Sequence, residues 1–132
     1  MEKEKLPDIH KTVILDASIV KVWKAVSTSE GIAGWWMPNT FEPVLDKEFI
    51  LHAGPYGDSP CKVTVLDPRN RVGFDWDKGW HLTIELSELE DGKTEFSLVH
   101  SGWTPEQAKI RETMNGGWEK IVKEDLPMYL EC

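Results

Sequence analysis

Histidine is the residue type in this chain best suited to chemistry near neutral pH, because its unperturbed pKa lies there. His100 follows Phe96 and Leu98 at intervals of two, so all three should share one face of a strand and point toward the interior. Such a histidine is either hydrogen-bonded within a core or in contact with a ligand. The other three show no spacing that would gather them around a metal ion: His10, His52 and His81.

Enzyme motifs give little support for catalysis. The sequence contains no nucleophile elbow, P-loop, dinucleotide-binding fingerprint or zinc-protease motif. The carboxylates lie on polar strand faces and turns, so Asp75 and Asp77 are most simply solvated. We therefore predict no catalytic residue, no metal and no cofactor, with His100 as the one titratable group that an enzyme could use.

Seven tryptophans are the unusual feature of the composition. Strand alternation and helix spacing point most of the large apolar side chains toward one interior space. They form either the wall of a ligand pocket, with His100 as its polar group, or an ordinary close-packed core. The candidate ligand-binding residues are Trp35, Trp36, Phe74, Trp76, Trp80, Leu82, Phe96, Leu98, His100, Met114, Gly117 and Trp118.

Two adjacent glycines, Gly116 and Gly117, interrupt the helix predicted at the C-terminus. Each costs about 1 kcal/mol relative to alanine inside a helix, so a local reason is expected. The pair either opens a pocket or relieves a close approach of helix and sheet beside Trp118, and we favour the second. The loop at residues 54–60 could be an entrance flap, although loops of this composition are common.

The C-terminal helix is predicted from Thr104 to about Leu130. Thr104, Pro105 and Gln107 are typical of a capping box with proline in the first turn. Apolar residues then recur at intervals of three and four and form one stripe. Pro127 should kink or break the helix, because its ring removes a backbone N–H.

The rest of the chain predicts a sheet for this helix to cover. A strand at 8–15 precedes two short helices, one at about 19–26 and one ending near Trp35. Asp16 or Ser18 could cap the first helix, and Ser27 could cap the second. Five β-type runs follow, joined by turns too short for anything but antiparallel pairing. They cover residues 41–51 (an irregular run), 61–66, 71–76, 80–89 and 94–101.

Composition limits the partners. The 132 residues predict one domain, spanning 1–132, and their formal net charge of −8 gives no electrostatic support for binding nucleic acid. No apolar run is long enough to span a membrane, and because the charged N-terminus leads into no apolar stretch, we expect no signal peptide. Two cysteines without metal or redox spacing favour a reduced, cytoplasmic setting.

In this order, the elements and their residues resemble the START-like helix-grip (SRPBCC) superfamily, within the branch of the activator of the heat-shock-protein-90 ATPase. The resemblance rests on residues 17–26 with their Val22-Trp23 pair, on 29–32 leading into Trp35-Trp36, and on Gly117-Trp118 with its trailing leucines. Ser18 stands where many relatives have proline, and Pro127 departs from the pattern. The resemblance implies an α+β fold in which a curved antiparallel sheet of about six strands wraps around the C-terminal helix and leaves a cavity.

Three functions follow. The first is non-catalytic binding of an apolar, lipid-like or aromatic small molecule in that cavity. The second is a chaperone accessory or other protein-interaction module that would use a surface patch at residues 35–38. A chaperone accessory would act in a stress response. The third is a cyclase-like or hydrolase-like enzyme using the same pocket. We favour the first, because fold alone does not establish chaperone binding.

Overall fold

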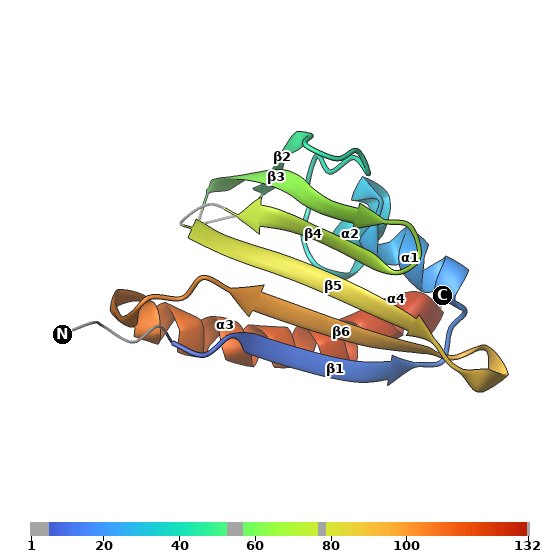
Figure 1. The fold of residues 1–132 in the computed structure, drawn as a ribbon. Coiled ribbons are helices and arrows are strands. Elements are labelled where there is room, and N and C mark those ends of the chain that lie inside the picture. Colours follow the sequence, from blue (N-terminus) through green and yellow to red (C-terminus); the bar gives the residue numbers. More distant parts are fainter. Residues whose placement is uncertain (1–5, 53–56, 77–78, 132) are drawn as a thin grey trace.

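A computed structural model describes residues 6–52, 57–76 and 79–131 of the chain. Six strands form one antiparallel sheet in the order β1-β6-β5-β4-β3-β2, and a long C-terminal helical segment lies across it (Figure 1). The strands are β1 (Ile9–Leu15), β2 (Glu48–His52), β3 (Asp58–Asp67), β4 (Arg71–Trp76), β5 (Trp80–Glu88) and β6 (Thr94–Ser101). This arrangement confirms the predicted α+β helix-grip fold.

Two short helices, α1 (Ile19–Val26) and α2 (Ser29–Trp35), follow β1. The Ser18 side chain accepts a hydrogen bond from the Lys21 backbone N–H, so Ser18 is the N-cap of α1. The cap predicted for α2 was wrong by one residue. Thr28 caps α2 by accepting from the Gly31 N–H, because the Ser27 hydroxyl instead donates to the Trp23 carbonyl (2.6 Å).

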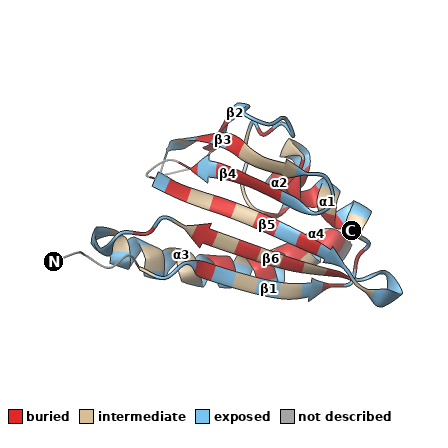
Figure 2. Cartoon of the chain, viewed as in Figure 1, coloured by how far each residue is buried: buried red, intermediate tan, exposed pale blue. Residues whose placement is uncertain are grey.

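Alternation along the strands sets the core. Buried residues alternate with partly buried ones along β6 and with partly buried or exposed ones along most of β5 (Figure 2), and the apolar face of each strand packs inward. The edge strand β1 places one charged side chain, Lys11, on its inward side, where it pairs with Glu119 (2.9 Å). This ion pair gives the inward ammonium group of Lys11 a partner of opposite charge.

The long helical segment begins with the predicted capping box. Thr104 and Gln107 complete the two reciprocal hydrogen bonds, and a single 3₁₀ turn at Pro105–Gln107 leads into α3 (Ala108–Lys120). A π-helical turn, η5 (Ile121–Asp125), and α4 (Leu126–Glu131) follow without a break. We expected a kink or a break at Pro127, and the helical segment does not break there. The wider turn precedes the proline, as π-turns do where the hydrogen-bond ladder must adapt.

Two predicted boundaries shift in the structure. The run at 41–51 contributes a strand only from Glu48, because a turn with Asp46 in the left-handed region (φ 67°) precedes it. The predicted flap is not one loop, since residues 58–60 belong to β3 and residues 54–56 lie outside the described part, as do 77–78. The turn between β5 and β6 is a short 3₁₀ turn, Glu90–Gly92.

Within the described ranges, the structure has no helix both long and apolar enough to span a membrane.

Candidate ligand site around His100

His100 lies near the end of β6 and is completely buried. The sheet register places it opposite Leu82 of β5 and Ile9 of β1. Four tryptophan rings surround its imidazole. Trp76 is stacked on it at a centroid distance of 4.9 Å, Trp103 lies at 4.5 Å, and the rings of Trp80 (5.0 Å) and Trp118 (6.3 Å) stand nearly perpendicular to it. We call these five residues the His100 cluster.

Four different parts of the chain build this cluster. Trp76 ends β4 and Trp80 begins β5, and the two are directly paired across the sheet. Trp103 follows β6 and donates its indole N–H to the His100 backbone carbonyl (2.9 Å). Trp118 comes from α3 and is the only buried residue of that helix. The cluster therefore fixes the position of the helix against the sheet.

One hydrogen bond determines the tautomer of His100, and burial determines its charge. The Trp118 indole Nε1–H donates to His100 Nδ1 (3.1 Å), and an indole nitrogen can only donate. The neutral ring must therefore carry its proton on Nε2. Burial among apolar rings lowers the pKa of His100 from 6.5 to about 3, so the imidazole stays neutral at physiological pH.

The Nε2–H of His100 has no hydrogen-bond partner among the described residues. The neighbouring indole N–H groups are otherwise occupied: Trp80 donates to the Gln107 side-chain oxygen (3.1 Å), and Trp118 to His100 itself. A buried donor left unpaired costs about 1–3 kcal/mol.

Trp36 covers the cluster from the outside. This half-buried residue follows α2, and its ring lies 4.9 Å from Trp118 and 5.4 Å from Trp76. It also stacks near Trp35 (6.1 Å) and Phe74 (6.3 Å). The Trp36 side chain thus extends from the cluster to the molecular surface.

The two helix glycines do not relieve a close approach. A Cβ atom added to Gly116 or Gly117 would meet no other atom within 4 Å. Our favoured explanation for the pair was therefore wrong, since open space lies over both positions. Gly117 is exposed, and Met114, one turn before Trp118, is only half-buried.

The predicted site residues separate into three groups. Trp36 and Met114 are half-buried, and Gly117 is exposed. The remaining members are buried together in one core: Trp35, Phe74, Trp76, Trp80, Leu82, Phe96, Leu98, His100 and Trp118.

Sequence reasoning missed two residues of the site. Trp103 lies between a strand and a helix cap, where no periodicity reaches, yet an apolar residue just before an N-cap often packs against its helix. Gln107 was predicted only as part of the capping box, whereas its side-chain oxygen accepts from both the Thr104 N–H (3.0 Å) and the Trp80 indole.

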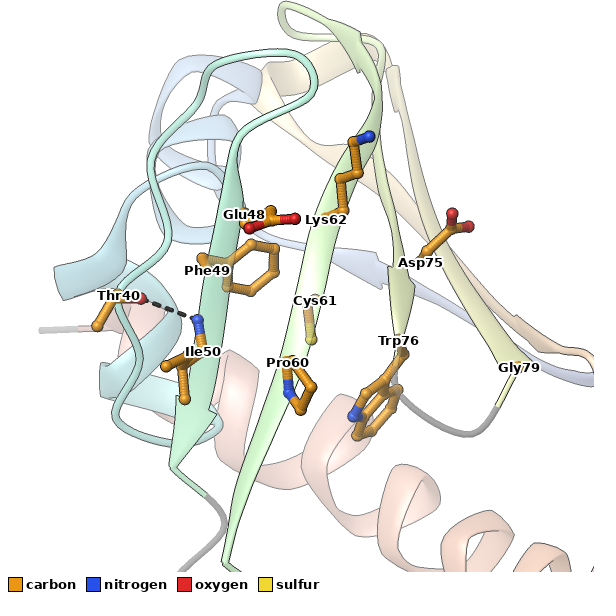
Figure 3. Close-up of a pocket in the computed structure, with 10 residues that line it drawn as sticks. All are labelled: Thr40, Glu48, Phe49, Ile50, Pro60, Cys61, Lys62, Asp75, Trp76 and Gly79. Atoms are coloured by element: carbon orange, nitrogen blue, oxygen red, sulfur yellow. Dashed lines mark hydrogen bonds between the residues drawn. The ribbon is translucent and has the colours of Figure 1, made fainter.

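One surface hollow shares a residue with the cluster. It is an open groove of about 570 Å³, and Figure 3 shows its lining drawn mainly from three neighbouring strands, β2, β3 and β4. Its exposed side chains include Glu48, Ile50 and Lys62. Trp76 is the one predicted site residue in the lining. Trp76 therefore belongs both to the lining of the groove and to the His100 cluster.

The second hollow, of about 300 Å³, lies at the other end of the molecule between β1 and α4. Its lining includes Leu15, Pro127 and Leu130 and none of the predicted site residues. The space between sheet and long helix is filled by the side chains of the core. Any ligand at the His100 cluster must therefore displace a ring.

The described residues include no group of three or more histidine, cysteine or acidic side chains that could hold a metal ion. The two histidines with carboxylate partners, His52 with Asp58 and His81 with Asp75, lie on the surface.

Comparisons with known proteins agree with the fold. The model of the family described as "Activator of Hsp90 ATPase homolog 1-like protein" matches residues 16–131. The solution structure of protein BH1534 from Bacillus halodurans is 42% identical, with a TM-score of 0.87, and the match covers 96% of this chain and 98% of that one. No protein with a curated description matches this chain.

More distant structures share the fold alone. A crystal structure of a Mesorhizobium loti protein has a TM-score of 0.86 at 21% identity, covering 95% of this chain and 97% of the other. The solution structure of the Aha1 dimer from Colwellia psychrerythraea has a TM-score of 0.78 at 21% identity, covering 89% and 91%.

Proposed function

The chain belongs to the Activator of Hsp90 ATPase homolog 1-like family within the SRPBCC superfamily, and on that basis we propose that it binds an apolar, aromatic or lipid-like small molecule without catalysis. The ligand would enter from the groove on β2, β3 and β4 and contact the His100 cluster. One observation carries the proposal: Trp76 forms part of both the groove and the cluster.

The groove has the size and character of a binding site. Its volume of about 570 Å³ lies within the range of roughly 300–1,000 Å³ typical of small-molecule sites. Exposed Ile50 and Pro60 supply apolar surface, and Glu48, Lys62 and Asp75 supply polar groups around it. Trp76 is 7% exposed, so most of this lining residue lies in the core.

Of the two rings that a ligand could move, Trp36 and Trp76, the first is the less buried. Trp36 is half-buried, and its α3 neighbour Trp118 follows an exposed glycine, Gly117. A rotation of Trp36 or Trp76 would exchange ring contacts within the protein for ring contacts with the ligand. Aromatic contacts of this kind contribute about 0.5–1.5 kcal/mol per pair beyond the buried area.

A spectroscopic titration tests this proposal. The seven indole N–H resonances in a ¹H–¹⁵N spectrum are followed while a fatty acid, a steroid or a diaryl ketone is added. We expect the signals of Trp36, Trp76 and Trp118 to move together with a rise in Tm. Trp23 on α1 serves as the internal reference, because no ring contact joins it to the cluster in the described structure. Unmoved cluster signals and an unchanged Tm with every compound would contradict the proposal.

A matched pair of substitutions locates the ligand. Ile50→Lys places a charge in the groove, whereas Val20→Lys places one on α1, and both positions are already exposed. We expect binding to weaken at least tenfold in the first variant and to be unchanged in the second. Equal affinity in both variants would show that the ligand does not bind in the groove.

Protein interaction is the second candidate, and the family description names an activator of an ATPase. The patch predicted for it, residues 35–38, offers little apolar surface because Trp35 is buried and Trp36 and Met37 are half-buried. A family description alone does not establish a partner for this chain. The cytoplasmic location and the single-domain organisation remain predictions.

A further inference from the structure

The Nε2–H of His100 is a buried donor that makes no hydrogen bond within the described structure. His100 Nδ1 is occupied by the Trp118 N–H, so the proton of the neutral ring resides on Nε2, and that group is unpaired in the described structure. His100 is 0% exposed, so bulk water does not reach it. Native proteins pair the great majority of such groups, and an exception requires a reason.

The surrounding rings cannot supply an acceptor atom. The indole nitrogens of Trp76, Trp80 and Trp103 are donors only. The one alternative within the cluster is the π face of Trp80, whose ring stands at 78° to the imidazole with the centroids 5.0 Å apart. Such an N–H···π contact is weaker than a hydrogen bond to oxygen. A hydrogen bond from Nε2–H to an oxygen atom of a ligand would therefore be stronger than any contact that the protein offers this group.

We infer that His100 selects the ligand by donating its Nε2–H to a neutral acceptor oxygen on an otherwise apolar, aromatic molecule. This inference rests on the proposed function and specifies its ligand class. A carbonyl or ether oxygen fits the donor. A carboxylate does not, because the cluster contains no cation to offset the removal of its charge from water. A protonated amine does not, because it can only donate and His100 Nδ1 already accepts from the Trp118 N–H.

Two molecules of nearly equal shape test the selection. Benzophenone and diphenylmethane differ in a carbonyl against a methylene group, and binding of each to the full chain is measured by calorimetry or by the indole signals. A buried donor that gains its partner favours the ketone, and we expect about 5-fold to 100-fold tighter binding of benzophenone. Equal affinity would overturn the inference and leave the proposed function standing. Binding of neither compound, when a fatty acid or a steroid does bind, would overturn the inference alone; binding of none of these compounds would overturn both.

Two variants assign the preference to His100. His100→Leu removes both ring nitrogens, and the preference for the ketone should fall to less than about 2-fold. His100→Gln keeps an acceptor for the Trp118 N–H and retains a donor, so part of the preference should remain. Full preference for the ketone in the leucine variant would overturn the assignment.

The wild-type protein gives a readout that does not depend on the folding of any variant. Long-range ¹H–¹⁵N correlations identify the protonated nitrogen of His100, and we expect it to be Nε2. Benzophenone should shift the Nε2 proton downfield, whereas diphenylmethane should not. A proton on Nδ1, or an Nε2 proton that the ketone leaves unmoved, would show that this group is not the ligand's donor.

Discussion

The two halves of the C-terminal helical segment carry the same kind of apolar stripe but are buried to different degrees. In α3, thirteen residues long, only Trp118 is buried. In the eleven residues that follow, Val122, Leu126 and Leu130 are all buried. Spacing alone does not separate the halves. The difference comes from what faces each of them.

The second half faces helices and strands that close over it. Its α4 packs against α1 and α2, and Tyr129 lies directly over Gly34 of α2. The first half faces the His100 cluster and the half-buried ring of Trp36. The comparison shows that one end of a helical segment can belong to the core while the other end forms the wall of a candidate site.

The largest expected effect comes from truncating the two stripes separately. Leu126→Ala should lower the free energy of unfolding by about 2–5 kcal/mol, because the cavity it leaves is fully enclosed. Met114→Ala, at a half-buried position, should lower it by about 1 kcal/mol or less. Urea denaturation of both variants measures the difference. Equal losses would abolish the distinction between the halves.

Acid should weaken the cluster. Burial lowers the pKa of folded His100 to about 3 against 6.5 when unfolded, so between these values the unfolded chain binds a proton that the folded chain does not. Stability is therefore unaffected above pH 6.5 and falls as the pH decreases toward 3. The loss from this group should be about 2–3 kcal/mol by pH 4.5. Denaturation of wild type and His100→Gln across pH 4.5–7.5 isolates the effect, and parallel curves would contradict it.

The fit of α4 against α2 can be tested at Gly34. A Cβ atom there would lie 2.2 Å from the Tyr129 ring, so Gly34→Ala should lower the free energy of unfolding by about 1–3 kcal/mol. The same substitution made in a Tyr129→Ala background should cost much less. An unchanged cost in this double-mutant cycle would mean that the ring is not the obstacle.

The smallest expected effect has the opposite sign. Gly117→Ala should raise the free energy of unfolding by about 0.5–1 kcal/mol, because alanine favours the helix and its methyl group meets no atom. Thermal unfolding measures the gain, with Gly116→Ala as a second case in open space. A loss of stability at either position would mean that the surface over α3 is occupied.

Local patterns predicted most of the fold. The strands at β5 and β6 follow from strict alternation, and the start of the long helix from Thr104 and Gln107. The segment before β2 could not be predicted in detail, because a turn through Asp46 depends on one residue's tolerance of the left-handed region. The π-turn likewise reflects how the whole helix adapts to Pro127.

The candidate site was predicted less completely. Alternation placed Trp76, Trp80 and His100 on the inner face, and the helical stripe added Trp118. Trp103 belongs to no periodic segment, and its contact with His100 arises only when the chain turns back after β6. The exposure of Gly117 depends on which face of the helix the sheet leaves uncovered, and the spacing within one segment does not predict this.

The inward lysine of β1 has a consequence for self-association. An edge strand exposes unpaired backbone groups, to which a strand from another molecule could add. Lys11 points inward from the middle of this edge and is tied to Glu119 of α3. A second chain that paired with β1 and pulled it from the helix would leave the ammonium group without its carboxylate. The ion pair therefore opposes edge-to-edge aggregation, a role separate from its small contribution to folding.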